Sequence, residues 1–74
     1  MSLKNLERIV VFGAEYCGFC KKAHSLLSKA NVKFSYLDTE EEDVFDNLCY
    51  LQKKYKYRMI PMIFIDEQFI GGYA

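Results

Sequence analysis

The chain has 74 residues, with ten basic and ten acidic side chains, so its formal net charge is zero. This length allows one domain with a small core, and a hydrophobic content of 51% predicts a folded rather than a disordered chain. No basic stripe indicates binding to nucleic acid, and no apolar run approaches the ~20 residues that a membrane-spanning helix needs. We therefore expect a single domain over residues 1–74, with neither nucleic acid nor membrane as a partner.

The chain contains three cysteines, Cys17, Cys20 and Cys49. An odd number argues against a secreted scaffold held together by disulfides. The N-terminus also lacks the apolar core of a signal peptide. We therefore expect a reducing, cytoplasmic setting in which the thiols are kept for chemistry.

The first half of the chain predicts a strand, a helix and a second strand. Residues 6–13 contain a continuous apolar run, which is typical of a strand covered on both faces. A helix is expected over residues 17–30, and Asn31 can end it in a left-handed conformation. Residues 32–38 alternate and predict a strand parallel to the first. The expected apolar face of the helix consists of Ala23, Leu26, Leu27 and Ala30.

The second half predicts a helix and a hairpin. Thr39 is expected to cap a helix over residues 41–55, whose start is favoured by the acidic run at 40–43. A third strand is expected at 62–65, followed by a turn at 66–68 and an antiparallel strand at 69–70. The order β-α-β-α-β-β fits an α/β fold with one mixed sheet and flanking helices. The expected core stripe of the second helix consists of Val44, Leu48, Leu51 and Tyr55.

Cys17 and Cys20 lie three residues apart, at the expected turn from strand to helix. Free backbone N–H groups and the positive end of the dipole favour an anion at a helix start, so a cysteine there ionises more easily, and the thiolate is the nucleophile. On the helical wheel Cys20 lies nearer the buried face, so Cys17 should be the reachable thiol and Cys20 the sheltered one. A Cys-x-x-Cys motif near a βαβ pattern indicates a thioredoxin-like redox site.

Other readings of these residues stay open. The pair could instead form half of a zinc site. A structural zinc site needs four ligands, and the other candidates in the chain are Cys49 and His24. We therefore favour the redox pair and expect no metal. Cys49 lies beside the core stripe and is expected to act as a small hydrophobic residue, with a second redox role as the alternative. His24 either tunes the thiols or is a solvated residue, and Tyr16 either lines the site or shields the turn.

Three motifs together resemble the glutaredoxin family, and the resemblance spans nearly the whole chain. It implies a thioredoxin-like fold with a four-stranded mixed sheet. The family continues past its paired glycines with a third helix. Because this chain ends at Ala74, we expect that C-terminal helix to be absent and one sheet face to be exposed. The motifs are Cys17-Gly18-Phe19-Cys20, then Ile60-Pro61 before Met62-Ile63-Phe64-Ile65, and Ile70-Gly71-Gly72-Tyr73.

The resemblance implies a glutathione-dependent thiol–disulfide oxidoreductase, with Cys17 and Cys20 as the catalytic pair. In the family the proline matching Pro61 is cis, and the backbone of the preceding residue, here Ile60, pairs with glutathione in the manner of a strand. Glutathione is thereby implied as co-substrate for a monomeric enzyme. Disulfide or glutathionylated proteins are the implied substrates, and the glutathione reductase system is an indirect partner. The glutathione-binding positions carried over are Phe19, Met59, Ile60, Pro61, Gly72 and Tyr73.

The chain departs from the family pattern near the first cysteine. Gly18 stands where many members have proline, and Ala14 stands where a Lys or Arg often helps to bind a glutathione carboxylate. Glu15 adds a negative charge beside Cys17, which opposes formation of a thiolate. The cations that could compensate are Lys21, Lys22 and Arg58.

Two alternative functions follow from the same resemblance. Cys-Gly-Phe-Cys differs by one atom from the Cys-Gly-Phe-Ser of monothiol glutaredoxins, which hold a [2Fe–2S] cluster between two subunits. The chain has no tryptophan and a short loop, which disfavours that function. The other alternative is an electron donor served by thioredoxin reductase, which Ala14 and Gly71-Gly72-Tyr73 leave open.

Overall fold

The computed structural model describes residues 6–72 of the chain. Its order of elements confirms the β-α-β-α-β-β arrangement expected from the sequence. None of the helices in this described part is long and apolar enough to cross a membrane. The elements are β1 (Ile9–Gly13), α1 (Gly18–Lys29), β2 (Phe34–Asp38), α2 (Glu42–Tyr55), β3 (Met62–Ile65) and β4 (Gln68–Gly71).

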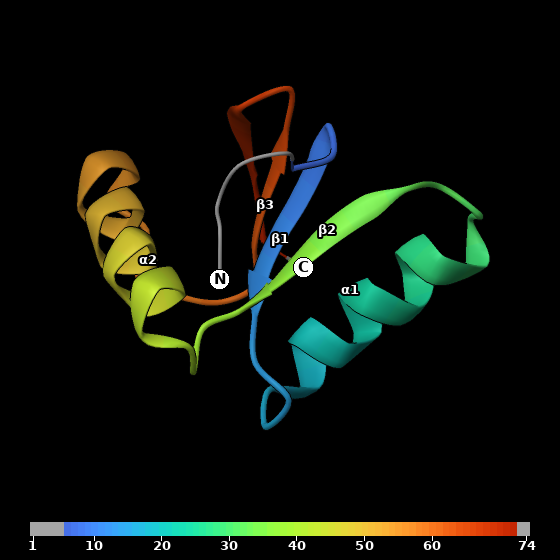
Figure 1. The fold of residues 1–74 in the computed structure, drawn as a ribbon, viewed down its shortest axis with the longest axis horizontal. Coiled ribbons are helices and arrows are strands. Elements are labelled where there is room, and N and C mark those ends of the chain that lie inside the picture. The colour runs from blue at the N-terminus through green and yellow to red at the C-terminus, as the bar shows by residue number, and fades with distance from the viewer. Residues whose placement is uncertain (1–5, 73–74) are drawn as a thin grey trace.

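The four strands form one mixed sheet in the order β2-β1-β3-β4. β1 pairs in parallel with β2, from Ile9 opposite Phe34 to Gly13 opposite Asp38. It pairs antiparallel with β3 on its other side, and β3 pairs antiparallel with β4. Figure 1 shows α1 and α2 on opposite faces of this sheet. The central position of β1 brings the loops that follow it and precede β3 to one end of the sheet.

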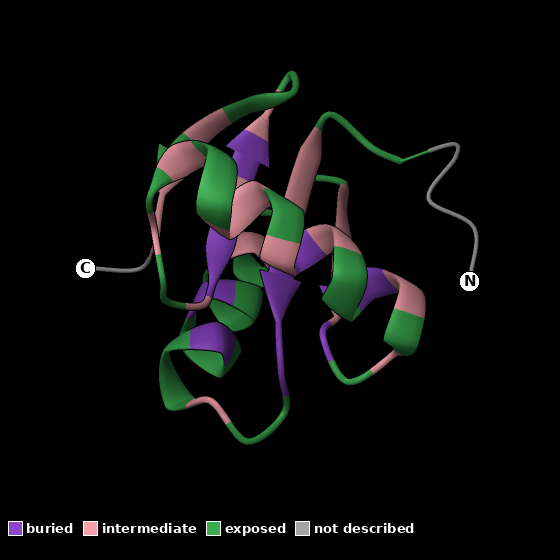
Figure 2. Cartoon of the chain, turned by 90° about the vertical axis from the view of Figure 1, so that its left-hand side faces the viewer, coloured by how far each residue is buried: buried purple, intermediate pink, exposed green. Residues whose placement is uncertain are grey.

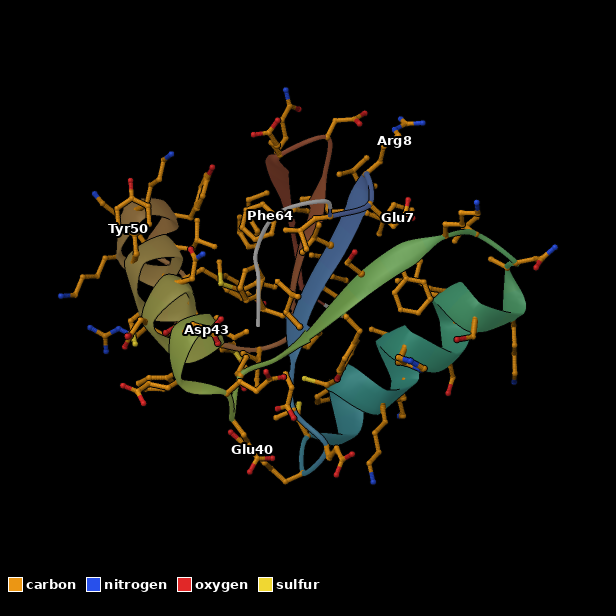
Figure 3. The ribbon with its side chains drawn as sticks, in the orientation of Figure 1. Glu7, Arg8, Glu40, Asp43, Tyr50 and Phe64 are labelled. Carbon is orange, nitrogen blue, oxygen red and sulfur yellow. The ribbon has the colours of Figure 1, made fainter. Side chains whose placement is uncertain are left out.

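The face of the sheet towards α2 carries the larger core. Alternation along the strands sends every second side chain to this face, where α2 covers it. Figure 3 shows Phe64 between the sheet and α2, whereas Tyr50 points outward from the same helix. The predicted stripe of α2 is confirmed: Val44 and Leu48 are buried, and Leu51 and Tyr55 pack against the core. The buried cluster consists of Phe12, Leu37, Val44, Leu48, Met62 and Phe64.

The face towards α1 is less completely covered. Ala23 of α1 is buried, but Leu26 is 60% exposed, so the predicted apolar face of this helix is only partly right. Leu26 borders an open groove of about 410 Å³ between α1 and the strands β3 and β4, where Ile70 is also exposed. Figure 2 shows buried residues on the strands, whereas much of each helix is exposed.

The start of α2 differs from the prediction. Thr39 is not its cap; the N-cap residue is Glu41, whose side chain makes no capping hydrogen bond. The backbone N–H of Thr39 instead donates to the carbonyl of Gly13 at 2.9 Å, and Thr39 is buried. Pairing between β1 and the chain after β2 therefore continues one residue further, and this moves the helix start along the chain.

Strand ends also differ from the predicted ranges. β1 begins at Ile9 rather than at residue 6, and β2 begins at Phe34 rather than at 32. The left-handed conformation expected at Asn31 is confirmed, with φ of 59°. The hairpin turn is shorter than expected, because Asp66 and Glu67 both have positive φ, as in a two-residue primed turn. Residue 68 therefore belongs to β4.

An ion pair closes the end of the sheet away from the cysteines. The Arg8 guanidinium donates to the Asp66 carboxylate at 2.7 and 2.8 Å, and the Asp66 N–H donates to the Arg8 carbonyl at 2.9 Å. Both side chains are exposed, so the pair contributes little stability. In Figure 3, Arg8 lies at one end of the sheet and Glu40 at the other, near the loop that follows β1.

Replacing Leu48 by alanine should destabilise the chain by about 2–5 kcal/mol, because it leaves a cavity under α2. The matched control is Phe45→Ala on the same helix, where the side chain is 51% exposed and the expected loss is below about 1 kcal/mol. Urea unfolding followed by circular dichroism measures both. Equal losses would contradict the assignment of the core to this face.

Candidate functional site

Cys17 is the N-cap residue of α1, with extended backbone at φ −96° and ψ 115°. Its Sγ accepts a hydrogen bond from the backbone N–H of Cys20 at 3.3 Å. The Cys17 N–H in turn donates to the carbonyl of Ala14 at 3.2 Å, which closes the turn after β1. Cys17 is half-buried and Cys20 is 0% exposed, so the predicted reachable and sheltered thiols are confirmed.

The loop before β3 meets Cys17. The peptide bond between Ile60 and Pro61 is cis, as the resemblance implied. The Ile60 carbonyl lies 3.8 Å from Cys17 Sγ, which donates to it. Pro61 is fully buried and Ile60 is half-buried, so the proline anchors the loop while the Ile60 backbone stays beside the thiol.

The paired glycines reach the same region from β4. Gly71 has φ of +121°, a conformation that residues with a Cβ rarely adopt. A Cβ at Gly72 would meet the Tyr57 hydroxyl, and it would lie 2.9 Å from the Pro61 carbonyl. The close approach expected of the glycine pair is therefore present at Gly72. Tyr73, which the resemblance also implied for glutathione binding, lies outside the described residues.

Exposed apolar side chains adjoin the half-buried thiol. Phe19, in the first turn of α1, is 53% exposed, and Met59, next to Ile60, is 62% exposed. Tyr16, next to Cys17, is 75% exposed. The Lys22 ammonium lies 5.5 Å from the centre of the Phe19 ring, which places a positive charge on this side of the site. The surface around Cys17 thus combines apolar rings with a cation.

Burial separates the chemistry of the two thiols. It raises the pKa of Cys20 to about 11, and hydrogen bonding and charge from Cys17 act in the same direction. A backbone hydrogen bond from Ala14 and a side-chain hydrogen bond with Tyr36 lower it. Cys20 is therefore protonated at neutral pH, which suits it to act second.

Two tyrosines in the site were not singled out from the sequence. Tyr36 lies opposite Val11 in the sheet, and its hydroxyl packs over Gly13 near Cys20. The Tyr57 hydroxyl packs over Gly72. The only signal for Tyr36 was its place in an alternating strand, which does not tell what it faces until the register with β1 is known.

The other candidate residues take separate positions. The His24 ring packs edge-on against the Phe34 and Tyr36 rings, with centroids 5.3 and 5.0 Å away, although the residue is exposed. Cys49 is half-buried on α2 and lines a shallow pocket of about 670 Å³. Across residues 6–72, no three His, Cys, Asp or Glu side chains gather as a metal-binding group. The pocket at Cys49 is also lined by Gln52, Lys53, Lys56 and Arg58.

Comparison with known proteins places these features in context. The sequence model of the glutaredoxin family matches residues 9–70 of the chain. Glutaredoxin-2 of Schizosaccharomyces pombe is 35% identical over 65 residues, which cover 86% of this chain and 59% of that protein. The residues that the family model matches contain the cysteine pair and the cis-proline, and they end directly before Gly71.

Solved structures share the fold. A wheat glutaredoxin is 28% identical, with a TM-score of 0.81, over 89% of this chain and 63% of the wheat chain. A buckwheat glutaredoxin–glutathione complex is 27% identical, with a TM-score of 0.80, over 88% of this chain and 60% of the buckwheat chain. The chain thus spans about three fifths of the length of these relatives. The thioredoxin-like fold expected from the sequence is confirmed.

Iodoacetamide at pH 7 should alkylate Cys17 at least about tenfold faster than Cys20, because Cys20 is buried and almost fully protonated. Since its pKa is raised, alkylation of Cys20 should accelerate as the pH rises and level off only near pH 11. Peptide mass spectrometry after timed quenching measures each site, with Cys49 as an internal control. Equal rates at pH 7 would contradict the two roles.

Proposed function

The chain belongs to the glutaredoxin family, and we propose that it is a glutathione-dependent thiol–disulfide oxidoreductase that works through Cys17 and Cys20. The observation that carries the proposal is the arrangement of the pair. Cys17 presents a half-buried sulfur at a helix N-terminus, and Cys20 lies behind it with no exposure. A helix N-terminus stabilises a thiolate, and the sheltered partner is held within one helical turn for a second attack.

In the first step, the Cys17 thiolate attacks the disulfide between a substrate and glutathione. The new bond joins Cys17 to glutathione, and the substrate sulfur leaves as a thiolate that takes up a proton. A second glutathione then attacks this mixed disulfide, which gives oxidised glutathione and restores Cys17. The Cys20 N–H, 3.3 Å from Cys17 Sγ, stabilises the sulfur anion at the start and the end of the cycle.

Protein disulfides take a second route in this proposal. Cys17 forms a mixed disulfide with the protein, and Cys20 then attacks Cys17 Sγ to release the substrate and close the Cys17–Cys20 bond. Two glutathione molecules return the pair to the dithiol state. Electrons thus pass from glutathione to disulfides, and the cell's thiol redox balance is maintained.

We propose that glutathione lies along the backbone of Ile60, with Pro61 and Gly72 at its sides. The Ile60 carbonyl beside Cys17 Sγ supports this, because a peptide-like substrate can pair with such a backbone segment. Phe19, Met59 and Tyr73 complete the proposed groove. The related buckwheat protein has been solved as a complex with glutathione, which supports the same co-substrate here.

Ala14 stands where the family often has a basic residue, so the carboxylates of glutathione must pair with a cation elsewhere in the chain. Ala14 is 0% exposed, so the position three residues before Cys17 offers no charged group to the surface. Arg58 is exposed and directly precedes Met59, and Lys22 lies over Phe19. We propose that these cations, with Lys21, replace the family's basic residue.

The partners in this proposal are glutathione, disulfide or glutathionylated proteins and, indirectly, glutathione reductase. An odd number of cysteines argues against a secreted scaffold held together by disulfides, which supports a reducing compartment. We propose the cytoplasm as the site of action. The proposed steps use residues of one chain only, which supports a monomer as the working unit.

Replacing Cys17 by serine should abolish both reactions, because it removes the nucleophile. Replacing Cys20 by serine should retain reduction of glutathione mixed disulfides and should lower reduction of protein disulfides by at least about 100-fold. Cys49→Ser is the matched control and should keep both activities. The proposed roles would be inverted if Cys17→Ser were the active variant.

Turnover should depend on glutathione with glutathione reductase and NADPH, and should be absent with thioredoxin reductase and NADPH alone. The substrate is a mixed disulfide between glutathione and a small thiol, and the readout is NADPH consumption followed at 340 nm. The Cys17→Ser variant gives the background rate. Turnover in the second assay alone would contradict glutathione dependence and would indicate a donor served by thioredoxin reductase.

A further inference from the structure

The buried thiol of Cys20 has a neighbour that the proposed mechanism does not yet use. Tyr36, on β2, lies on the α1 side of the sheet, and its hydroxyl occupies the space above Gly13. A Cβ at Gly13 would lie 2.5 Å from the Tyr36 hydroxyl and 3.0 Å from the Cys20 Cβ. Because Gly13 has no side chain, the Tyr36 phenol and the Cys20 side chain can both occupy the space beside it.

Cys20 must lose a proton before it can attack, and burial makes this difficult. Its side chain is 0% exposed, so water does not solvate the anion that forms. While Cys17 is itself a thiol or thiolate, its hydrogen bond and charge raise the pKa of Cys20 further. Once Cys17 is bonded to a substrate sulfur, both of these contributions end. The Ala14 backbone and the Tyr36 hydroxyl remain as the groups that lower it.

The Tyr36 hydroxyl stays protonated throughout. Burial, followed by the charges of Cys20 and Cys17, raises the pKa of Tyr36 to about 12, and Asp38 acts in the same direction. The phenol is therefore a hydrogen-bond donor rather than a proton acceptor at neutral pH. Its ring packs against the His24 ring in a T-shaped arrangement, with the ring centroids 5.0 Å apart.

A small pocket of about 400 Å³ connects this phenol with solvent. Its lining includes Tyr36 together with charged and polar groups of the β1–α1 turn and of α1. The pocket is open to water, so solvent reaches Tyr36 beside the buried thiol. The lining groups are Glu15, Lys21, His24, Ser25 and Tyr36.

We propose that Tyr36 is a positioning residue for the resolving step, in which its hydroxyl donates a hydrogen bond to the sulfur of Cys20. The inference rests on the proposed dithiol function. In this step Cys20 gives its proton to solvent, and its electron pair forms the Cys20–Cys17 bond. The bond between Cys17 and the substrate sulfur breaks, and the substrate leaves as a thiolate that takes up a proton. The two cysteines are oxidised, and the substrate disulfide is reduced.

The first test compares the two reactions in Tyr36→Phe, which keeps the ring and removes the hydroxyl. The ratio of the protein-disulfide rate to the glutathione-mixed-disulfide rate should fall about tenfold at pH 7, the size expected for loss of a hydrogen bond to an anion. Tyr55→Phe, also half-buried but packed against Phe64 and Phe69, is the matched control and should leave the ratio unchanged. An unaltered ratio in Tyr36→Phe would overturn the proposal.

The second test is independent of activity. In a Cys17→Ser chain, Cys20 has no thiolate neighbour, as in the mixed disulfide. Its ionisation is followed by the ¹³Cβ shift of labelled cysteine, with and without Tyr36→Phe. The midpoint should rise by about one pH unit when the hydroxyl is removed. No rise would overturn the hydrogen bond, whereas a rise in this variant together with no glutathione-dependent turnover in the protein that retains Cys17 would overturn only the proposed function.

Discussion

The hydrogen bond from the Cys20 N–H to Cys17 Sγ is the interaction on which the site depends. It makes Cys17 the cap of α1, so the helix start and the nucleophile occupy one position. The spacing of three residues then has two effects. It brings a free N–H of the first turn to the sulfur, and it turns the Cys20 side chain towards the sheet, where burial keeps it protonated. One local motif thus assigns different chemistry to two identical side chains.

The topology of the sheet supplies the remaining groups. β1 has β2 on one side and β3 on the other, so its C-terminal end meets Tyr36 and Asp38 of β2 and the loop that carries Pro61. Two close approaches of the backbone depend on glycine. Gly13 leaves space for the Tyr36 hydroxyl, and Gly72 leaves space for the Tyr57 hydroxyl. A Cβ at either position would push a phenol away from the site.

Local signals in the sequence were enough to predict the cysteine pair at a helix start, the order of elements and the bounds of β3, and the family resemblance supplied the cis-proline loop. They failed where a distant partner decides the outcome. Thr39 has a side chain that can cap a helix, but its backbone N–H donates a hydrogen bond to the Gly13 carbonyl and so extends the pairing with β1. Leu26 has core periodicity but borders an open groove. Tyr36 looked like an ordinary strand residue, because only the register with β1 shows that it faces Cys20.

The electrostatics of the pair impose an order on the proposed reaction. Two thiolates a few ångströms apart in a poorly solvated site repel each other, so the two ionisations are coupled and only one anion forms readily. Cys17 is half-buried and its Sγ accepts a hydrogen bond from an N–H, whereas Cys20 is fully buried. Formation of the mixed disulfide removes the hydrogen bond and the charge of Cys17, which add to burial in raising the pKa of Cys20. The product of the first step therefore favours ionisation of the nucleophile of the second.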